Sequence, residues 1–316
     1  MLVESDGEAA LFDAPEGSFV KSTDETGLPT STYLSESIEA LLGTETKLKY
    51  ILYTHAHWDH MGAAGFVYNH FAQRDSVAPT VIASSRVRRS LNAKEKRSPT
   101  SDWYNNRGVP IPEKMSKSEY EHIMVGGLTL EVTKINAHMA GDVHVYLDKT
   151  VPGNAAQGIT KSLIFVVDVV NPGWAPYWMA GITTDLPGYL DALDEVMTYD
   201  FDVMVPGHLT RLGTKADVQV YIDFFQHVLE GGKYGIAEAP ASLSIAGTGV
   251  FTPGNVNSGN LWLLTNEIME SQGNACVDYV LDTAARGRDW LTELAGTELV
   301  LYSQCWAMQS AILTGG

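Results

Sequence analysis

The stretch Tyr53-Thr54-His55-Ala56-His57-Trp58-Asp59-His60 places three histidines and one aspartate within six residues. Residues 48–52, which precede it, are mostly apolar and favour a β-strand. Residues 61–68, which follow it, are small and apolar, as in a helix packed closely on a sheet. The run therefore falls on a strand-to-helix loop at the carboxyl end of a strand, where open α/β sheets place their functional sites.

The residue types in this loop favour metal binding. Neutral imidazole and carboxylate groups suit zinc and its neighbours among the divalent metals. Four donors within six residues would crowd a single ion. A short turn can instead direct His55 and His57 to one ion and Asp59 and His60 to another, so the pattern predicts two ions. The alternative is a polar loop with solvated histidines, which the rarity of the pattern and its place after a strand disfavour.

The pattern His55-x-His57-x-Asp59-His60 resembles the signature of the metallo-β-lactamase-fold hydrolases. That superfamily includes class B β-lactamases, glyoxalase II, lactonases, phosphotriesterase-like enzymes, nucleases and iron-dependent persulfide dioxygenases. The resemblance implies the α/β class and a four-layer αββα sandwich, with the metal ions at one edge of the two sheets. It says nothing about the substrate.

The same resemblance implies the remaining metal ligands. The family has a histidine on a later loop, an aspartate at the end of a strand and a histidine on a last loop, and this chain offers His138, Asp168 and His208 in that order. The implied cofactor is a pair of Zn²⁺ ions per chain, with iron or manganese as alternatives. In the implied assignment one ion is held by His55, His57 and His138, the other by Asp59, His60 and His208, and Asp168 bridges both.

Three of the individual assignments depend on local pattern. Asp168 interrupts the apolar run 162–170, predicted to be a strand buried on both faces. A buried carboxylate there is costly unless it is paired or bound to metal, although it could also accept backbone N–H bonds. His144 is the alternative to His138, but it lies in an alternating segment that predicts a strand. Asp13, after the predicted strand 9–12, resembles the family's aspartate behind the metal loop and is interpreted as structural support.

The resemblance implies a dinuclear zinc-dependent hydrolase that uses a metal-bridging hydroxide on an ester, lactone or amide (β-lactam-like) small molecule. Lactonase and β-lactamase are candidate activities, and Asp59 and His208 are the expected catalytic residues. The chain has no Gly-x-Ser-x-Gly motif that would indicate a serine nucleophile. The alternatives are a mononuclear iron dioxygenase of the same fold acting on a thiol or persulfide, a phosphoester hydrolase, and a non-enzymatic binding module.

The composition indicates which binding partners and which cellular compartment to expect. The 316 residues include 21 Lys and Arg against 38 Asp and Glu, a net charge of −17 that disfavours nucleic acid. No apolar stretch approaches the length of a membrane span, and no signal peptide is visible. We therefore expect a cytoplasmic protein, or a periplasmic or secreted one if an N-terminal leader is missing. Cys276 and Cys305 are expected to be buried free thiols, with a disulfide if the protein is exported.

The pattern of elements predicts a catalytic domain over residues 1–230 and a helical extension over 231–316, acting as a cap or an oligomer interface. A small-molecule substrate and a homo-oligomer formed through the C-terminal helices are the expected partners. The polar segment 84–122, with Trp103 and Tyr104, is predicted to be an insertion. The aromatic, turn-rich segment 171–178 suits the wall of an apolar substrate pocket, or else packs against the C-terminal helices.

Overall fold

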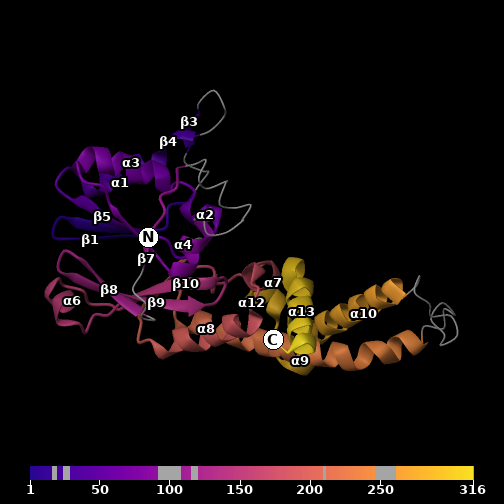
Figure 1. The fold of residues 1–316 in the computed structure, drawn as a ribbon. Helices are drawn as coiled ribbons and strands as arrows, with labels where there is room; N and C mark the ends of the chain where they lie inside the picture. Colours follow the sequence, from indigo (N-terminus) through magenta and orange to yellow (C-terminus); the bar gives the residue numbers. More distant parts are fainter. Residues whose placement is uncertain are drawn as a thin grey trace. The chain divides into compact units, whose positions relative to one another are not determined.

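The computed structural model describes residues 1–15, 20–23, 29–91, 108–114, 120–208, 211–245 and 261–315. The chain divides into two compact units. The sheet unit comprises Met1–Val167 and Asp200–Gly207, and the helical unit comprises Asp168–Tyr199 and His208–Gly316. The two units are drawn together in Figure 1, and each is described by itself below.

The first sheet of the sheet unit has the strand order β1-β2-β5-β6-β7. Strands β1 and β2 form an antiparallel hairpin, and β2, β5, β6 and β7 run parallel to their neighbours. A short separate hairpin joins β3 and β4. The bounds are β1 Leu2–Ser5, β2 Glu8–Phe12, β3 Val20–Thr23, β4 Pro29–Thr32, β5 Lys47–Leu52, β6 Thr80–Ala83 and β7 Glu113–Lys114.

The second sheet has the order β12-β11-β10-β9-β8. In the order β8, β9, β10, β11, each strand pairs antiparallel with its neighbour, and β11 pairs parallel with β12. Both sheets are therefore mixed. The bounds are β8 Tyr120–Val125, β9 Leu128–Asn136, β10 Ala140–Leu147, β11 Leu163–Val166 and β12 Val203–Pro206.

Alternation along β2 explains why the sheets stack. Successive side chains of a strand point to opposite faces, so Ala10 and Phe12 enter the core shared with the second sheet, while Ala9 and Leu11 face the helices. All four are buried. Helices α1 and α3 cover the outer face of the first sheet (Figure 1). The helices of this unit are α1 Tyr33–Leu42, α2 Trp58–Met61, α3 Ala64–Asp75, α4 Ser85–Leu91 and α6 Pro152–Ala156.

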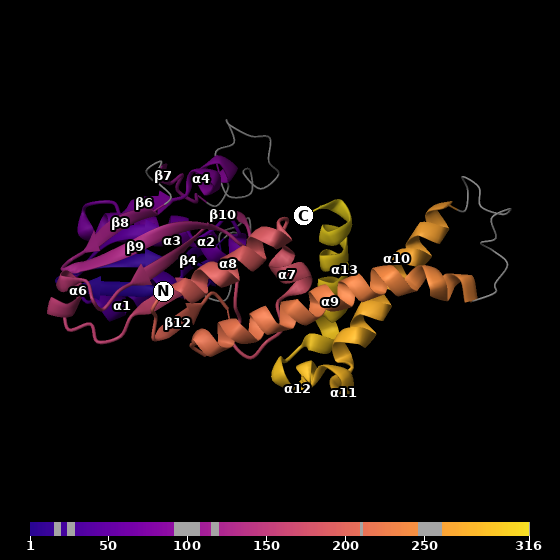
Figure 2. The same ribbon diagram turned by 90° about the horizontal axis from the view of Figure 1, so that it is seen from below.

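The helical unit is built around α9, which packs against α10, α13 and α8 (Figure 2). Helices α9 and α10 approach closely at Gly235. A Cβ atom at this position would lie 2.3 Å from the carbonyl oxygen of Gln272, so a larger residue would not fit. None of the described helices has the length and apolar character needed to cross a bilayer. The bounds are α7 Trp178–Ile182, α8 Leu186–Thr198, α9 Lys215–Ile245, α10 Leu261–Leu281, α11 Thr283–Arg286, α12 Trp290–Glu293 and α13 Thr297–Thr314.

The predicted fold class is confirmed: two mixed sheets are flanked by helices, with further helices at the C-terminus. One strand was predicted too long. The apolar run 162–170 forms a strand only over Leu163–Val166, and Asp168 lies beyond it in a left-handed turn with φ of 60°. The predicted domain boundary at residue 230 stays a prediction; it falls inside α9.

The expectation of two free thiols is wrong. Cys276 of α10 and Cys305 of α13 form a disulfide within the helical unit. The two residues stand 29 positions apart, and only the packing of the two helices brings them together. Both cysteines are buried. The bond therefore fixes α13 against α10 at a depth that solvent does not reach.

We expect the disulfide to stabilise the protein by about 3–4 kcal/mol, the loop-closure entropy for a separation of this size. The double variant Cys276→Ala/Cys305→Ala should lose that much free energy of unfolding in urea relative to the oxidised protein. Thiol titration of the urea-unfolded protein without reductant should find no free thiol. Two titratable thiols in that experiment would show that the bond does not form.

Candidate metal centre

The first donor loop follows β5 directly. The strand ends at Leu52, and the short helix α2 begins at Trp58, so His55 and His57 lie on the loop between them. His57 is the residue that precedes the first turn of α2, and Asp59 and His60 lie in that turn. The loop is held on both sides: Tyr53 N donates to Ile82 O at 2.9 Å, and Gly62 N donates to Trp58 O at 2.7 Å. The prediction of a strand-to-helix loop is confirmed.

The second donor loop joins β9 to β10 and carries His138. Asp142 shapes it, because one carboxylate oxygen accepts a hydrogen bond from Met139 N at 2.6 Å. Asn136 accepts from Gly141 N at 3.3 Å. Gly141 has φ of +89°, and a Cβ atom there would lie 2.5 Å from the Cβ atom of Arg86, so only glycine fits. The loop is thus a tight, internally bonded turn.

A backbone hydrogen bond joins the two loops: Val143 N donates to Thr54 O at 3.0 Å. It brings His138 to the histidines of the first loop. The ring centroid of His138 lies 4.6 Å from that of His57 and 5.0 Å from that of His55. The centroids of His55 and His57 are 4.7 Å apart, and those of His55 and His60 are 4.3 Å apart. Four imidazoles predicted as ligands from sequence therefore gather in one cluster.

The cluster fits a divalent metal. Neutral imidazole is the form that binds zinc, and the three nitrogens offered by His55, His57 and His138 lie within 4.8 Å of one another. His138 Nε2 is 2.9 Å from His57 Nδ1. Two ligands on a tetrahedral zinc, each about 2.0–2.1 Å from the ion, are separated by a similar distance, roughly 3.3 Å. His55 and His138 are buried, so the nitrogens are shielded from bulk water.

Asp13 supports both loop and helix from behind. Its carboxylate accepts from Thr54 N at 2.8 Å and from Thr54 Oγ1 at 2.8 Å. His60 Nδ1 lies 3.1 Å from Asp13 Oδ2 and donates its proton there, which leaves Nε2 as the metal-binding nitrogen of His60. The Thr54 hydroxyl proton is committed to Asp13, so Thr54 Oγ1 accepts from His55 Nδ1 at 3.0 Å and leaves Nε2 of His55 as the donor to metal.

The backbone repeats this connection. Ala14 N donates to His60 O at 2.6 Å, and Ala63 N donates to Ala14 O at 3.0 Å. Asp13 itself adopts φ of 60°, a left-handed conformation that aspartate tolerates better than most residues. The interpretation of Asp13 as structural support agrees with these contacts. Asp59 lies at the other side of His60, with 3.6 Å between its Oδ2 and His60 Nε2.

The remaining two predicted ligands, Asp168 and His208, are the first residues of the two chain segments that form the helical unit. Asp168 follows Val167 directly, and His208 follows Gly207 directly. His208 Nε2 lies 3.2 Å from Asp168 Oδ1. Asp168 is mostly buried and His208 is exposed. The structure thus brings five predicted ligands together in the sheet unit and pairs the other two in the helical unit.

His144, the alternative to His138 as a ligand, lies on a strand and not on a donor loop. His144 lies inside β10 and is fully buried, and desolvation lowers the pKa of its ring from 6.5 to about 4. Its ring is therefore uncharged at neutral pH and packs in the core. Sequence reasoning missed Thr54 and Asp142 as supports of the donor loops. The spacing of Asp142, three residues after Met139, is a turn signal that could have revealed it. Trp103 and Tyr104 lie outside the described residues.

Comparison with known proteins agrees with this geometry. A family model described as the metallo-beta-lactamase superfamily matches residues 1–150, which include the five ligands of the sheet unit. A beta-lactamase domain protein from Burkholderia ambifaria superposes with a TM-score of 0.52 at 16% identity, over 90% of this chain and 81% of that one. A metallo-beta-lactamase family protein from Thermus thermophilus gives 0.49 at 19% identity, over 73% and 75%. No curated protein matches the chain by sequence.

Residues 1–150 of the 316-residue chain therefore match the metallo-beta-lactamase superfamily, and the chain has the fold of that superfamily. At these identities the solved structures show the shared fold alone. The donor chemistry of the His and Asp cluster is that of a candidate metal site.

We expect Asp13→Asn to lower zinc affinity by roughly 10–100-fold, because loss of the carboxylate frees the orientation of His60 and His55. Competition with a chromophoric chelator measures the change. Asp75→Asn is the matched control: Asp75 is also a carboxylate that supports β5, accepting from Leu48 N at 3.1 Å, but it touches none of the candidate ligands. Equal losses of affinity in both variants would mean that Asp13 acts through general stability only.

Proposed function

We propose that the protein is a dinuclear zinc-dependent hydrolase of an ester, lactone or amide (β-lactam-like) small molecule. The observation that carries the proposal is the gathering of four imidazoles and a carboxylate on two supported loops. In the proposed assignment His55, His57 and His138 would hold one ion and Asp59 and His60 the other, with Asp168 and His208 as the further ligands.

The strand register supports the inclusion of Asp168 and His208. Strands β11 and β12 run parallel, and their last registered pair is Val166 with Pro206. Asp168 and His208 each stand two residues beyond that pair, so both leave the sheet at the same edge. Parallel strands deliver the side chains that follow them to one side of a sheet, which is where the functional sites of such sheets lie.

When bound, two zinc ions lower the pKa of a water molecule to near neutrality and polarise the oxygen of the bond under attack. The chain's own residues position the reaction. Asp59, partly exposed beside His60, would ligate an ion and accept a proton from the attacking water. His208, paired with Asp168 and exposed, is the ligand most open to an arriving substrate.

The disulfide favours one compartment over another. Structural disulfides persist in oxidising surroundings and are rare in the cytosol. Cys276–Cys305 therefore supports the periplasmic or secreted alternative over the cytoplasmic one. A small-molecule substrate remains part of the proposal, since the net charge of −17 opposes binding to polyanions.

Metal analysis and metal removal test the proposal. The purified protein should contain about two zinc ions per chain, lose hydrolysis of a 4-nitrophenyl ester or of nitrocefin in a chelator, and regain it with added zinc. His208→Ala should retain about one ion and lose more activity than the roughly 10–100-fold expected for a supporting hydrogen bond. A single iron per chain would instead support a dioxygenase, and chelator-resistant hydrolysis would rule the mechanism out.

A further inference from the structure

The loop that follows Asp168 carries aromatic side chains that the fold leaves in solvent. Trp174 is 44% exposed, Tyr177 63% and Trp178 54%, and Ile182 at 55% completes the patch. Part of each side chain is nevertheless covered: Trp174 Cε3 would lie 3.9 Å from a Cβ atom at Gly296. We name Trp174, Tyr177, Trp178 and Ile182 the aromatic patch. The other residue expected to line a pocket, Asn171, is buried.

Although its side chains are exposed, the backbone of the loop is firmly held. Tyr189 of α8 donates to Val169 O, and Tyr221 of α9 accepts from Asn171 N at 3.0 Å and donates to Trp174 O at 2.8 Å. Burial raises the pKa of both tyrosines above its ordinary value, so both hydroxyls keep their protons. The loop is therefore a rigid support and its aromatic side chains have fixed starting positions.

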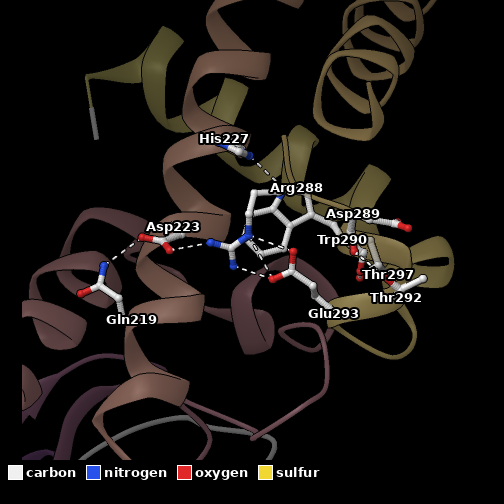
Figure 3. A network of polar contacts seen from close by, with 9 residues as sticks. All are labelled: Gln219, Asp223, His227, Arg288, Asp289, Trp290, Thr292, Glu293 and Thr297. Atoms are coloured by element: carbon white, nitrogen blue, oxygen red, sulfur yellow. Dashed lines mark hydrogen bonds and ion pairs between the residues drawn. The ribbon is translucent and has the colours of Figure 1, made fainter. Parts of the chain in front are cut away.

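A second support comes from the segment between α12 and α13. Ala175 N donates to Ala295 O at 2.9 Å, and Ala295 N donates to Gly173 O at 3.0 Å. That segment is itself fixed to α9 by the polar network in Figure 3. Arg288 binds Glu293 through two nitrogens and Asp223 of α9 at 2.9 Å.

The end of the loop has an unusual backbone. Met179, Ala180, Gly181 and Ile182 all have positive φ values, which form a left-handed turn inside α7. Side chains other than glycine rarely adopt this conformation, and it persists only where the surroundings impose it. Here Gln304 of α13 imposes it. Gln304 is fully buried, accepts from Ala180 N at 2.6 Å, and donates to Pro176 O at 2.8 Å and Tyr177 O at 2.9 Å.

The loop is continuous with the candidate ligands of the same unit. It begins at Asp168, which lies 3.2 Å from His208. Further along, a Cβ atom at Gly173 would lie 3.5 Å from Arg211, three residues after His208. The loop that follows Asp168 and the chain that follows His208 are thus in contact at two points. The aromatic patch therefore lies on the same loop as the candidate ligand Asp168.

We propose that the aromatic patch binds an apolar or aromatic group attached next to the bond that the protein hydrolyses, and that Gln304 is the positioning residue of the patch. This inference rests on the proposed function and names its substrate class: esters, lactones or amides with a bulky apolar acyl group. Exposed aromatic side chains on a firmly held backbone next to a candidate ligand offer flat faces to such a group, and aromatic side chains lose little conformational freedom on binding.

Two paired measurements test it. With zinc bound, 4-nitrophenyl phenylacetate should have a higher kcat/KM than 4-nitrophenyl acetate, and Trp178→Ala and Tyr177→Ala should reduce that ratio about tenfold, chiefly through KM. With zinc removed, calorimetry should detect phenylacetamide binding to the wild-type protein, weakened in the same variants. Gln304→Met should act like Trp178→Ala on KM and leave kcat unchanged. Tyr234→Ala, an exposed aromatic of α9, is the matched control and should change neither measurement.

These experiments distinguish a failure of the proposed hydrolase function from a failure of the proposed role of the aromatic patch. Probe binding through Trp178 in a protein that hydrolyses nothing would overturn the proposed function and leave the patch as a binding site. Zinc-dependent hydrolysis with the same phenylacetyl-to-acetyl ratio in wild type, Trp178→Ala and Tyr177→Ala would overturn the patch and leave the function. An unchanged KM in Gln304→Met would remove Gln304 from the proposal.

A different surface carries a second inference. Helix α13 has a single charged residue, Glu298, among its 18 residues. Leu301, Cys305 and Met308 are buried on one side, yet Leu299, Tyr302 and Leu313 are exposed on another. Exposed apolar side chains on a helix with so little charge mark a candidate interaction surface. Between α13 and α10 lies a groove of about 330 Å³ whose lining, which includes Met269, Trp306 and Leu313, contains no charged residue.

We infer that this face of α13 and α10 binds the same face of a second copy of the chain. The net charge of −17 makes two copies repel each other over most of their surface. The uncharged lining of the groove, which Glu270 near Tyr302 flanks, is where two such copies can meet with few like charges opposed, and a twofold axis places the same patch on both sides. The expected homo-oligomer is therefore a dimer formed through the C-terminal helices.

Sedimentation equilibrium tests this dimer. The wild-type protein should sediment at twice the chain mass of 34.4 kDa, and Leu313→Glu should sediment as a monomer. Leu41→Glu is the matched control, because Leu41 on α1 is 77% exposed and Leu313 is 62% exposed. Leu41→Glu should remain dimeric. A wild-type protein that is monomeric at all concentrations, or a dimeric Leu313→Glu variant, would contradict the inference. So would a wild-type protein that binds an apolar small molecule in the groove and remains monomeric.

Discussion

The carboxylate of Asp13 is the interaction on which the candidate metal centre depends. It binds the backbone and side chain of Thr54 and receives the Nδ1 proton of His60. One side chain at the end of β2 thereby fixes the loop after β5 and the first turn of α2. Each imidazole whose Nδ1 proton is committed in this way presents Nε2 alone, so Asp13 determines the tautomer as well as the position of the donors.

Asp13 and Asp168 occupy equivalent places in the two sheets. Each follows a strand, β2 or β11, and each has φ of 60°. The left-handed conformation turns the chain sharply, and aspartate accepts it because its short carboxylate can bond locally. In one sheet the carboxylate supports the donor loop, and in the other it is a candidate donor itself. The same left-handed aspartate thus occurs in both units.

Local sequence patterns sufficed for the strand-to-helix loop that carries His55 and His57, because it depends on residues close in the chain. Asp168 shows their limit. The apolar run 162–170 predicted a strand through the aspartate, but β11 ends at Val166, opposite Pro206 of β12. Proline has no N–H to continue the ladder, and that constraint lies 40 positions away from Val166. The Cys276–Cys305 bond and the contact of Gln304 with Pro176, 128 positions apart, escaped the sequence for the same reason.

The backbone strain in this chain is concentrated where the chemistry is. Among the described residues outside glycine, left-handed φ values occur at Asp13, at Asp168 and in the turn from Met179 to Ile182, besides Asp6 and Ser76 in turns. Each such residue costs roughly 1–2 kcal/mol. Hydrogen bonds from Thr54, Tyr189 and Gln304 hold the adjoining segments in place. Strained backbone of this kind persists only where its surroundings impose it, and here it occurs at two candidate ligand positions or their supports and beside the aromatic patch.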